Sequence, residues 1–274
     1  MPHRQIHAPL TVISPHLDDA VFSCGCLIAA AQDPVVVTVL AGVPRERTVS
    51  TDWDLAAGFD TATQAVIHRR QEDARSLKRL GARPEWLDFL DGQYGLRYGP
   101  EQLVTSLAAA ALHRGGTVVV PMGLFHSDHI LVSRACLLMM RATTMAMPPV
   151  TTAPLRPASP LPALPPLRWL FYEDVIHRRV PGVVQDRLRH WWQEGLVTTP
   201  VDFALTPYQT IKMEAVAAYT SQLPLFDAHQ LADLAAPERY WSIDIASVET
   251  AAPDRTSIVA SQREVQAFQR ASRA

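Results

Sequence analysis

The sequence predicts an α/β protein built on a mostly parallel sheet, because short apolar runs alternate with longer helical segments along its first half. Two of these runs, at residues 10–13 and 117–122, each end in a turn that contains histidine and aspartate. A β-α-β alternation with helices on both faces is typical of a Rossmann-like core. We therefore expect ligands at the carboxyl ends of the strands.

The elements of this core follow one another along the chain. The apolar run at residues 10–13 predicts a buried strand, and the small residues of 20–31 predict a helix. The other expected strands are 35–41, 86–90 and 117–122, and the other helices are 63–80, 101–113 and one from Asp128 or His129 to about residue 140. No Gly-x-Gly-x-x-Gly pattern follows the first strand, so this core predicts no nucleotide cofactor.

The chain divides into four expected parts. Residues 1–147 form the core and carry both metal motifs, while residues 148–166 contain eight prolines and form either a linker or an apolar wall beside the active site. Residues 167–248 form a smaller C-terminal α+β portion that completes the fold, with strands at 169–175, 197–203 and 240–245 and a helix at 207–222. Residues 249–274 form a polar, peripheral tail.

Histidine and aspartate gather in two short motifs, Ser-Pro-His-Leu-Asp-Asp at residues 14–19 and Phe-His-Ser-Asp-His at residues 125–129. Each motif lies at an expected strand-to-helix turn, where side chains three residues apart can point into one crevice. Together they offer two imidazoles and a carboxylate as ligands for one metal, and they leave two carboxylates and one histidine for other roles. Three such ligands are a common catalytic zinc set, although each residue alone would also fit a helix cap or a structural hydrogen bond.

Several segments resemble the PIG-L/LmbE-like deacetylases, zinc enzymes that remove N-acyl groups from glucosamine-containing molecules. The resemblance rests first on the two motifs, and it spans about residues 8–245. Further segments that carry it are His-Arg-Arg-Gln-Glu-Asp at 68–73, Tyr-Glu-Asp at 172–174, Ala-Tyr-Thr-Ser-Gln at 218–222 and Pro-Glu-Arg-Tyr-Trp at 237–241. Leu17, Ala20 and Ser127 depart from the commonest family pattern, but none of these positions supplies a metal ligand.

The resemblance implies a role for each residue of the two motifs. The implied zinc ligands are His16, Asp19 and His129. Imidazole and carboxylate ligands of this kind also bind iron or cobalt. Asp18 matches the general base, and His126 matches the residue that stabilises the oxyanion or assists proton transfer. Asp128 is expected to orient a histidine.

Three further residues are expected to contact the substrate. Arg69 matches a family position that contacts the glycan or a phosphate-like group, although a surface ion pair is the alternative. Asp91 follows an expected strand and could accept hydrogen bonds from sugar hydroxyls. Trp53 lies in residues 43–62, a long irregular connection that forms either a lid or an ordinary surface loop.

Composition excludes some function classes. The 25 basic and 27 acidic residues give a net charge of −2 without a basic cluster, which argues against nucleic-acid binding. No run of about twenty apolar residues and no apolar leader is present, which predicts a cytoplasmic protein without a membrane span. Cys24 and Cys26 lie on the first expected helix, where packing is the more typical role.

The sequence thus predicts a zinc-dependent hydrolase that removes an N-acetyl or N-acyl group from a glucosamine moiety of a small glycosylated molecule. It is most similar to the antibiotic branch of the family, which includes deacetylases of N-acetylglucosaminyl glycopeptide pseudoaglycones of the teicoplanin type. The alternatives are a deacetylase or amidase of a glucosaminyl-inositol thiol cofactor and a non-catalytic sugar-binding relative. Acyl length, aglycone and oligomeric state stay open at this stage.

Overall fold

A computed structural model of the protein describes residues 8–45, 49–145 and 166–245. All of the expected proline-rich segment except Pro166, and the whole expected tail, lie outside the described residues. The division of the chain into a core, a linker, a C-terminal portion and a tail therefore stays a prediction.

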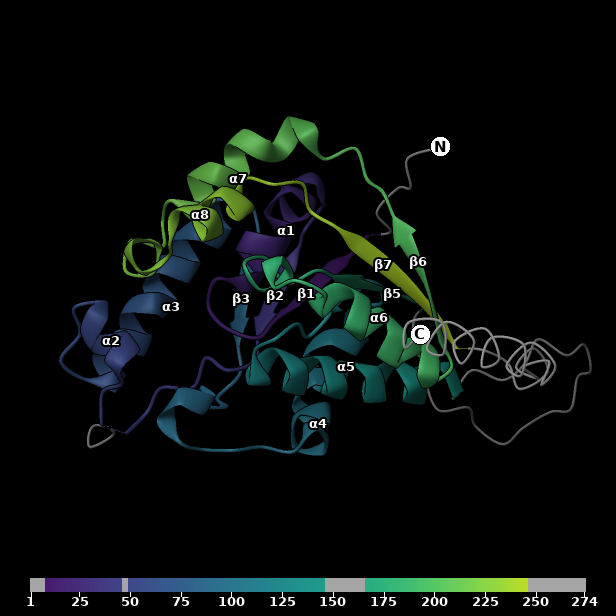
Figure 1. The fold of residues 1–274 in the computed structure, drawn as a ribbon, viewed down its shortest axis with the longest axis horizontal. Helices are drawn as coiled ribbons and strands as arrows, with labels where there is room; N and C mark the ends of the chain where they lie inside the picture. Colours follow the sequence, from purple (N-terminus) through teal and green to yellow (C-terminus); the bar gives the residue numbers. More distant parts are fainter. Residues whose placement is uncertain (1–7, 46–48, 146–165, 246–274) are drawn as a thin grey trace, which may run out of the picture.

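Seven strands form one mixed sheet in the order β3-β2-β1-β4-β5-β7-β6 (Figure 1). Their bounds are β1 Leu10–Ser14, β2 Val35–Thr38, β3 Arg83–Trp86, β4 Gly116–Pro121, β5 Leu167–Tyr172, β6 Leu196–Val201 and β7 Tyr240–Ile245. The first five are parallel in the Rossmann order, and β7 runs antiparallel to both β5 and β6. The predicted α/β class with a mostly parallel sheet is confirmed.

Helices cover both faces of the sheet. One apolar cluster joins it to α4 Pro100–Ala111, α5 Ser127–Met145 and α6 Val183–Gln193. A second cluster, on the opposite face, joins it to α1 Asp19–Ala30, α3 Ala62–Arg79, α7 Gln209–Val216 and α8 Ala228–Leu234. In β1, Ile13 belongs to the first cluster and Val12 to the second, because alternate side chains of a strand point to opposite faces.

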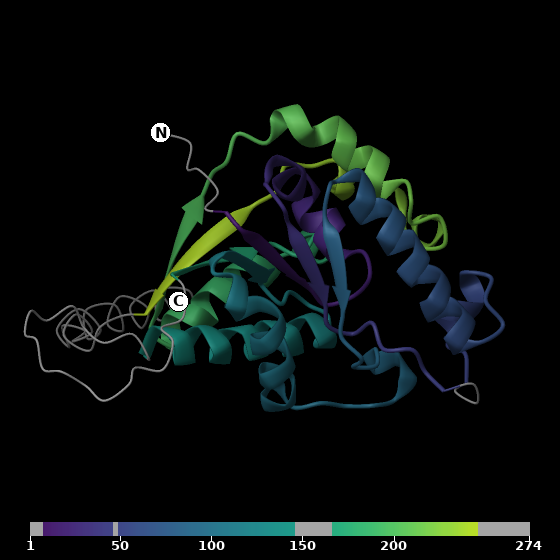
Figure 2. The same ribbon diagram turned by 180° about the vertical axis from the view of Figure 1, so that it is seen from behind.

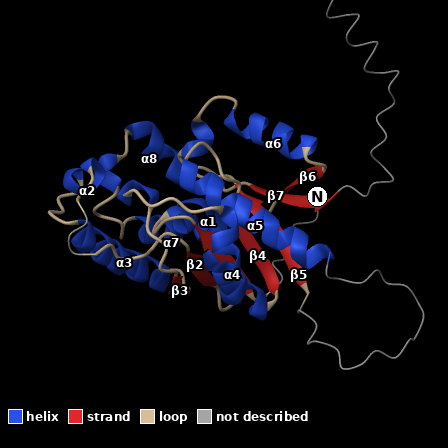
Figure 3. Ribbon diagram, turned by 90° about the horizontal axis from the view of Figure 1, so that it is seen from below, coloured by secondary structure: helices blue, strands red, loops and turns tan. Residues whose placement is uncertain are grey.

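The two edges of the sheet differ in their surroundings. β3 lies at one edge and β6 at the other, which Figure 2 shows from behind. The short helix α2, Asp52–Ala56, lies with α3 and α8 at the end of the molecule far from β6 and β7 (Figure 3). Every helix within the described residues is too short or too polar to cross a bilayer.

Several predicted elements differ from the structure by one to three residues at an end, and others, including β3 and α7, differ by more. The strand expected at 86–90 is β3, which ends at Trp86, because the edge position lets exposed Arg83 and Pro84 pair with β2. The helix expected at 207–222 ends at Val216, because Thr220 and Ser221 turn to donate hydrogen bonds to the Glu72 carboxylate. Helices α2, α6 and α8 were not predicted.

A buried ion pair fastens the C-terminal part to α1. Nζ of Lys212 on α7 lies 3.0 Å from Oε1 of Glu238, and both side chains are almost completely buried. The same carboxylate accepts the backbone N–H groups of Cys26 and Leu27 at 2.8 and 3.1 Å. Gly25 leaves room for this arrangement, since an added Cβ would lie 2.7 Å from Cγ of Lys212.

Candidate metal centre

The two histidine motifs meet where the strand order reverses. The motif of residues 14–19 follows β1, and the motif of residues 125–129 follows the neighbouring strand β4. The chain leaves β1 for β2 on one side and later returns to β4 on the other side. Such a switch point opens a crevice beyond the carboxyl ends of the strands.

The turn between β1 and α1 is held by Ser14. Its hydroxyl donates to the carbonyl oxygen of His16 at 2.6 Å and accepts the N–H of Ala20 at 2.9 Å. Asp18 occupies the N-cap position of α1, yet its side chain makes no capping hydrogen bond. A serine hydroxyl thus binds the start of the helix, and the Asp18 carboxylate lines the crevice instead.

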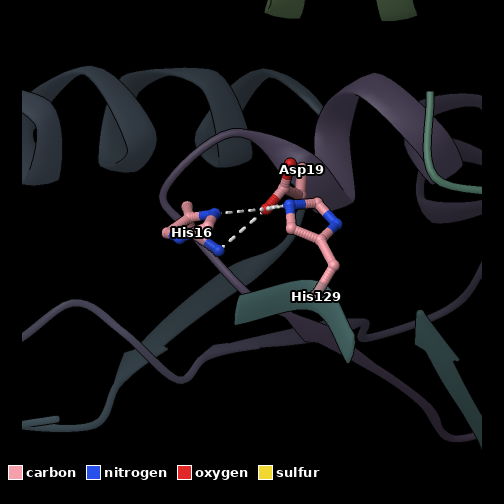
Figure 4. Close-up of side chains that lie close together, drawn as sticks. All are labelled: His16, Asp19 and His129. Carbon is pink, nitrogen blue, oxygen red and sulfur yellow. Dashed lines mark hydrogen bonds and ion pairs between the residues drawn. The ribbon is translucent and has the colours of Figure 1, made fainter. Parts of the chain in front are cut away.

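His16, Asp19 and His129 come together around one point (Figure 4). Oδ2 of Asp19 lies 3.1 Å from Nδ1 of His16 and 3.2 Å from Nε2 of His129. One donor atom from each of the three residues lies within 4.8 Å of the others. Two imidazoles and a carboxylate at this spacing suit a divalent metal with an open position for water or substrate.

Each imidazole of this set has a carboxylate at its other nitrogen. Nε2 of His16 lies 3.2 Å from Oδ2 of Asp128, and Nδ1 of His129 lies 2.6 Å from Oδ1 of Asp174. Such partners fix the tautomer, so the nitrogen that faces Asp19 can carry the lone pair for a metal. Asp128, expected to orient a histidine, therefore lies against His16.

The pKa values of the two carboxylates at the helix start, Asp18 and Asp19, are shifted in opposite directions. Burial opposes the charge on Asp19, but His129 and His16 outweigh it and hold its pKa well below the usual range. Burial and the charge of Asp19 raise the pKa of Asp18 to about 7. Asp19 is thus poised to bind a cation, while Asp18 can gain or lose a proton near neutral pH.

His126 lies beside the candidate ligands with a defined tautomer. Its Nδ1 accepts the backbone N–H of Asp128 at 3.3 Å, so the neutral ring carries its proton on Nε2. Burial, together with His16 and His129, lowers the pKa of His126 and favours this neutral form. The arrangement makes His126 a hydrogen-bond donor.

Arg69, Asp91 and Trp53 line the same pocket as these residues, and its volume is about 360 Å³. Nη2 of Arg69 donates to Oδ1 of buried Asp54 at 2.8 Å, and Nε1 of Trp53 donates to Oε1 of Gln222 at 2.8 Å. Oδ2 of Asp91 lies 3.9 Å from Nε2 of His16. The structure therefore places all three residues at the pocket. Arg69 is bound to α2 through Asp54, and Trp53, which belongs to α2, is bound to Gln222.

Two residues of the site were not assigned from the sequence. Asp174 follows β5, which pairs with β4, and the available signal was its place in the family-like Tyr-Glu-Asp segment at residues 172–174. Its Oδ2 also accepts the N–H groups of Gly123 and Leu124, at 2.9 and 3.0 Å. The ring centroid of His177 lies 4.6 Å from that of His129. This histidine stands outside both motifs, and its sequence context gave no signal for a role in the site.

The family described as PIG-L, GlcNAc-PI de-N-acetylase, matches residues 11–140, which contain both motifs. The resemblance to the PIG-L family is confirmed. No curated protein matches this PIG-L-like chain.

Solved structures similar to this PIG-L-like chain include a deacetylase triple mutant of the teicoplanin biosynthetic pathway. The two share 22% identity over 88% of this chain and 100% of that one, with a TM-score of 0.66. An A40926 pseudoaglycone deacetylase shares 23% identity over 87% and 98%, with a TM-score of 0.60. A zinc-inhibited form of teicoplanin deacetylase shares 19% identity over 87% and 99%, with a TM-score of 0.62. These likenesses show a shared fold.

Proposed function

We propose that the protein is a zinc-dependent amide hydrolase that removes an acetyl or longer acyl group from the nitrogen of a glucosamine moiety. The observation that carries this proposal is the position of Asp18. Its carboxylate lies in the pocket beside the His16, Asp19 and His129 set, and it does not cap the helix whose N-cap position it occupies. A hydrolase needs a base there, whereas a structural metal site does not.

The reaction is a hydrolysis with water as the nucleophile. Zinc held by His16, Asp19 and His129 would lower the pKa of water to about 7 and polarise the acyl carbonyl. Asp18 accepts the proton that water loses as its oxygen forms a bond to the acyl carbon. When the C–N bond breaks, Asp18 returns that proton to the leaving nitrogen, so the products are an amine and a carboxylic acid, whose proton then passes to the amine to give an ammonium and a carboxylate at neutral pH.

His126 is proposed to meet the charge that develops on the acyl oxygen. Its Nε2–H is directed as a donor by the hydrogen bond at Nδ1, and its neutral form requires no proton uptake before it donates. Removing a donor of this kind costs about 100-fold or more in turnover in comparable sites. Asp128 acts indirectly, since it positions His16 and supplies the N–H that orients His126.

The charges of the pocket favour a glycoside without phosphate. Among the described residues that line it, Arg69 is the only lysine or arginine, and Asp54 pairs with it. A phosphoinositide would need a further cation, because a phosphate binds through charge-assisted contacts. Phe22, Trp53 and Phe226 instead provide an apolar wall that suits a bulky aglycone.

A glycopeptide pseudoaglycone is the proposed substrate branch, supported by this wall and by the names of the similar solved deacetylases. A glucosaminyl-inositol compound of a thiol cofactor pathway is the alternative, because inositol would also meet the polar rim of Asp91, Gln93 and Gln222. A sugar-binding protein without activity is the least favoured reading, since it leaves Asp18 without a role.

The test is to incubate the zinc-loaded protein with N-acetylglucosamine, N-acetylglucosaminyl-inositol and an N-acetylglucosaminyl glycopeptide pseudoaglycone. Mass spectrometry should detect the loss of an acetyl group, fastest for the pseudoaglycone. Asp18→Asn should lower turnover at least about 100-fold while its zinc content stays equal to that of the wild type. The matched control is Asp88→Asn, because that side chain is 94% exposed.

Three results would count against the proposal. Absence of a free amine from every compound at full zinc occupancy would remove the deacetylase function. Unchanged turnover in Asp18→Asn would remove its role as the base. A preference for the inositol compound would replace the glycopeptide branch by the thiol-cofactor branch.

A further inference from the structure

His177 enters the pocket from a strained turn. It follows β5 by a few residues, and the residue before it, Ile176, has a φ of 67°. A β-branched side chain rarely adopts this left-handed conformation, which costs on the order of 1–3 kcal/mol. Such strain persists only where surrounding contacts enforce it, and it is concentrated at functional sites.

Contacts on both sides hold this turn in place. The N–H of Val175 donates to Oγ of Ser23 at 3.1 Å, and the N–H of Ile176 donates to Oδ2 of Asp233 at 2.9 Å. Arg178 forms a buried ion pair with the same aspartate, with Nη2 2.9 Å from Oδ1. The fold therefore fixes the residues on both sides of His177, which holds the backbone of His177 beside the pocket.

The His177 ring joins the histidines of the metal centre. Its centroid lies 4.6 Å from that of His129 in an edge-on contact and 5.7 Å from that of His126 in a stacked contact. Phe125 stacks on it at 6.1 Å, and the Phe125 side chain is 64% exposed. His177 thus lies between His126, the proposed oxyanion donor, and the exposed Phe125 at the edge of the site.

The nitrogens of His177 differ from those of its neighbours. His16, His126 and His129 each have a hydrogen-bond partner in the protein, whereas no hydrogen bond joins the His177 ring to another residue in the described part of the chain. An imidazole offers one donor and one acceptor in its neutral form. In a pocket lined by His177, that capacity is available to a bound molecule.

We propose that His177 binds the substrate by hydrogen bonding to a hydroxyl of its glucosamine ring. This inference rests on the proposed function, because it takes an N-acylglucosamine as the ligand. Beyond its carbonyl an acyl chain has no group that can pair with an imidazole nitrogen, whereas the sugar carries several hydroxyls. The exposed ring of Phe125, which stacks on His177, offers an apolar face to the sugar or aglycone.

The variant His177→Phe separates the hydrogen bond from the stacking, because phenylalanine keeps an aromatic ring and loses both nitrogens. Calorimetric titration of the zinc-loaded protein with glucosamine should show binding weakened about tenfold, the value expected for one lost hydrogen bond. Acetate binding and zinc content should stay unchanged. KM for the best N-acetylglucosaminyl compound should rise about tenfold, while kcat changes less.

Two further variants complete the design. His177→Gln keeps hydrogen-bonding groups and should recover part of the glucosamine affinity. His113→Phe is the matched control, because that histidine is exposed and its ring contacts the carbonyl of Ala109 in the preceding helix α4. Thermal unfolding of each variant checks that the fold is retained.

The outcomes distinguish this inference from the proposed function. Equal glucosamine affinity and equal KM in wild type and His177→Phe would overturn the inference while deacetylation stands. Loss of zinc in His177→Phe would make His177 a metal ligand and overturn it as well. Glucosamine binding that depends on His177 in a protein without deacetylase activity would keep the inference and remove the function. Absence of both binding and turnover in the wild type overturns both.

Discussion

Asp174 accepts a hydrogen bond from Nδ1 of His129 at 2.6 Å and thereby joins the end of β5 to the candidate metal centre. Its other oxygen accepts the amides of Gly123 and Leu124, so one buried carboxylate holds both a candidate ligand and the turn that precedes it. A carboxylate in this position raises the basicity of the ligating imidazole and fixes its orientation. The strength of metal binding should therefore depend on a residue that does not contact the metal.

We expect Asp174→Asn to lower zinc affinity about 10- to 100-fold, because the amide removes the negative charge that faces His129. Competition with a chelator of known affinity measures the effect. Asp88→Asn is the control, since it makes the same chemical change at an exposed site. Equal zinc affinities for the two variants would show that Asp174 only stabilises the turn at Gly123 and Leu124 and does not affect metal binding.

Gly92 makes a close approach to Asp128 that should be sensitive to a single methyl group. The N–H of Gly92 donates to Oδ2 of Asp128 at 3.0 Å, and an ideal Cβ on Gly92 would lie 2.6 Å from Oδ1 of the same carboxylate. We expect Gly92→Ala to displace Asp128 from His16 and to weaken zinc binding about tenfold. Chelator competition and thermal unfolding should be measured together.

Gly99→Ala provides the comparison for that variant. Its Cβ would meet only the flexible ends of Glu101 and Gln102, at 3.1 and 3.8 Å, and Gly99 lies far along the chain from both motifs. Zinc affinity should be unchanged there. A fall of similar size in both glycine variants would indicate a general loss of stability instead of a displaced Asp128.

Asp73 should make the stability of the protein depend on pH. Burial raises its pKa to about 6, although Trp86 and Tyr219 donate hydrogen bonds to its two oxygens at 2.7 and 2.9 Å. In the unfolded chain an aspartate has a pKa of about 3.9, so the folded state binds this proton more tightly. The stabilisation is fully present below about pH 4 and is lost as the pH rises through about 6.

Asp73→Asn should remove this dependence. The difference in free energy of unfolding between wild type and variant should shift by about 1 kcal/mol between pH 5 and pH 7.5, with the wild type relatively more stable at the lower pH. Urea unfolding at the two pH values measures it. A difference that stays constant, or that moves in the opposite direction, would contradict the raised pKa of Asp73.

The two motifs that contain the candidate ligands could be located from the sequence because their geometry is local, whereas the choice of His16, Asp19 and His129 within them came from the family resemblance. His16 and Asp19 are three residues apart across one strand-to-helix turn, and His126 and His129 are three apart across another. A parallel sheet brings the carboxyl ends of neighbouring strands together, so two such turns predict one site. The apolar alternation likewise predicted the α/β class, because strands and helices differ in their hydrophobic period.

Other features depend on contacts between distant parts of the chain. Asp174 lies 45 residues beyond His129, and Gln222 lies 169 residues beyond Trp53, so no spacing in the sequence relates either pair. The irregular connection of residues 43–62 contains α2, which is anchored to Arg69 through Asp54. Thr51 caps that helix locally, but five residues are too few for a stable helix, so its distant partners are needed to hold it.

The sequence by itself therefore determined the sheet-forming core and the His16, Asp18, Asp19, His126 and His129 constellation, since both follow from short-range spacing and from the geometry of parallel strands. Only the tertiary structure decided which carboxylates stand behind the histidines, where β3 ends, and that His177 faces the pocket from a strained turn. The physical reason is that hydrogen bonds and packing across the fold, which join residues without any fixed separation in the chain, select these arrangements.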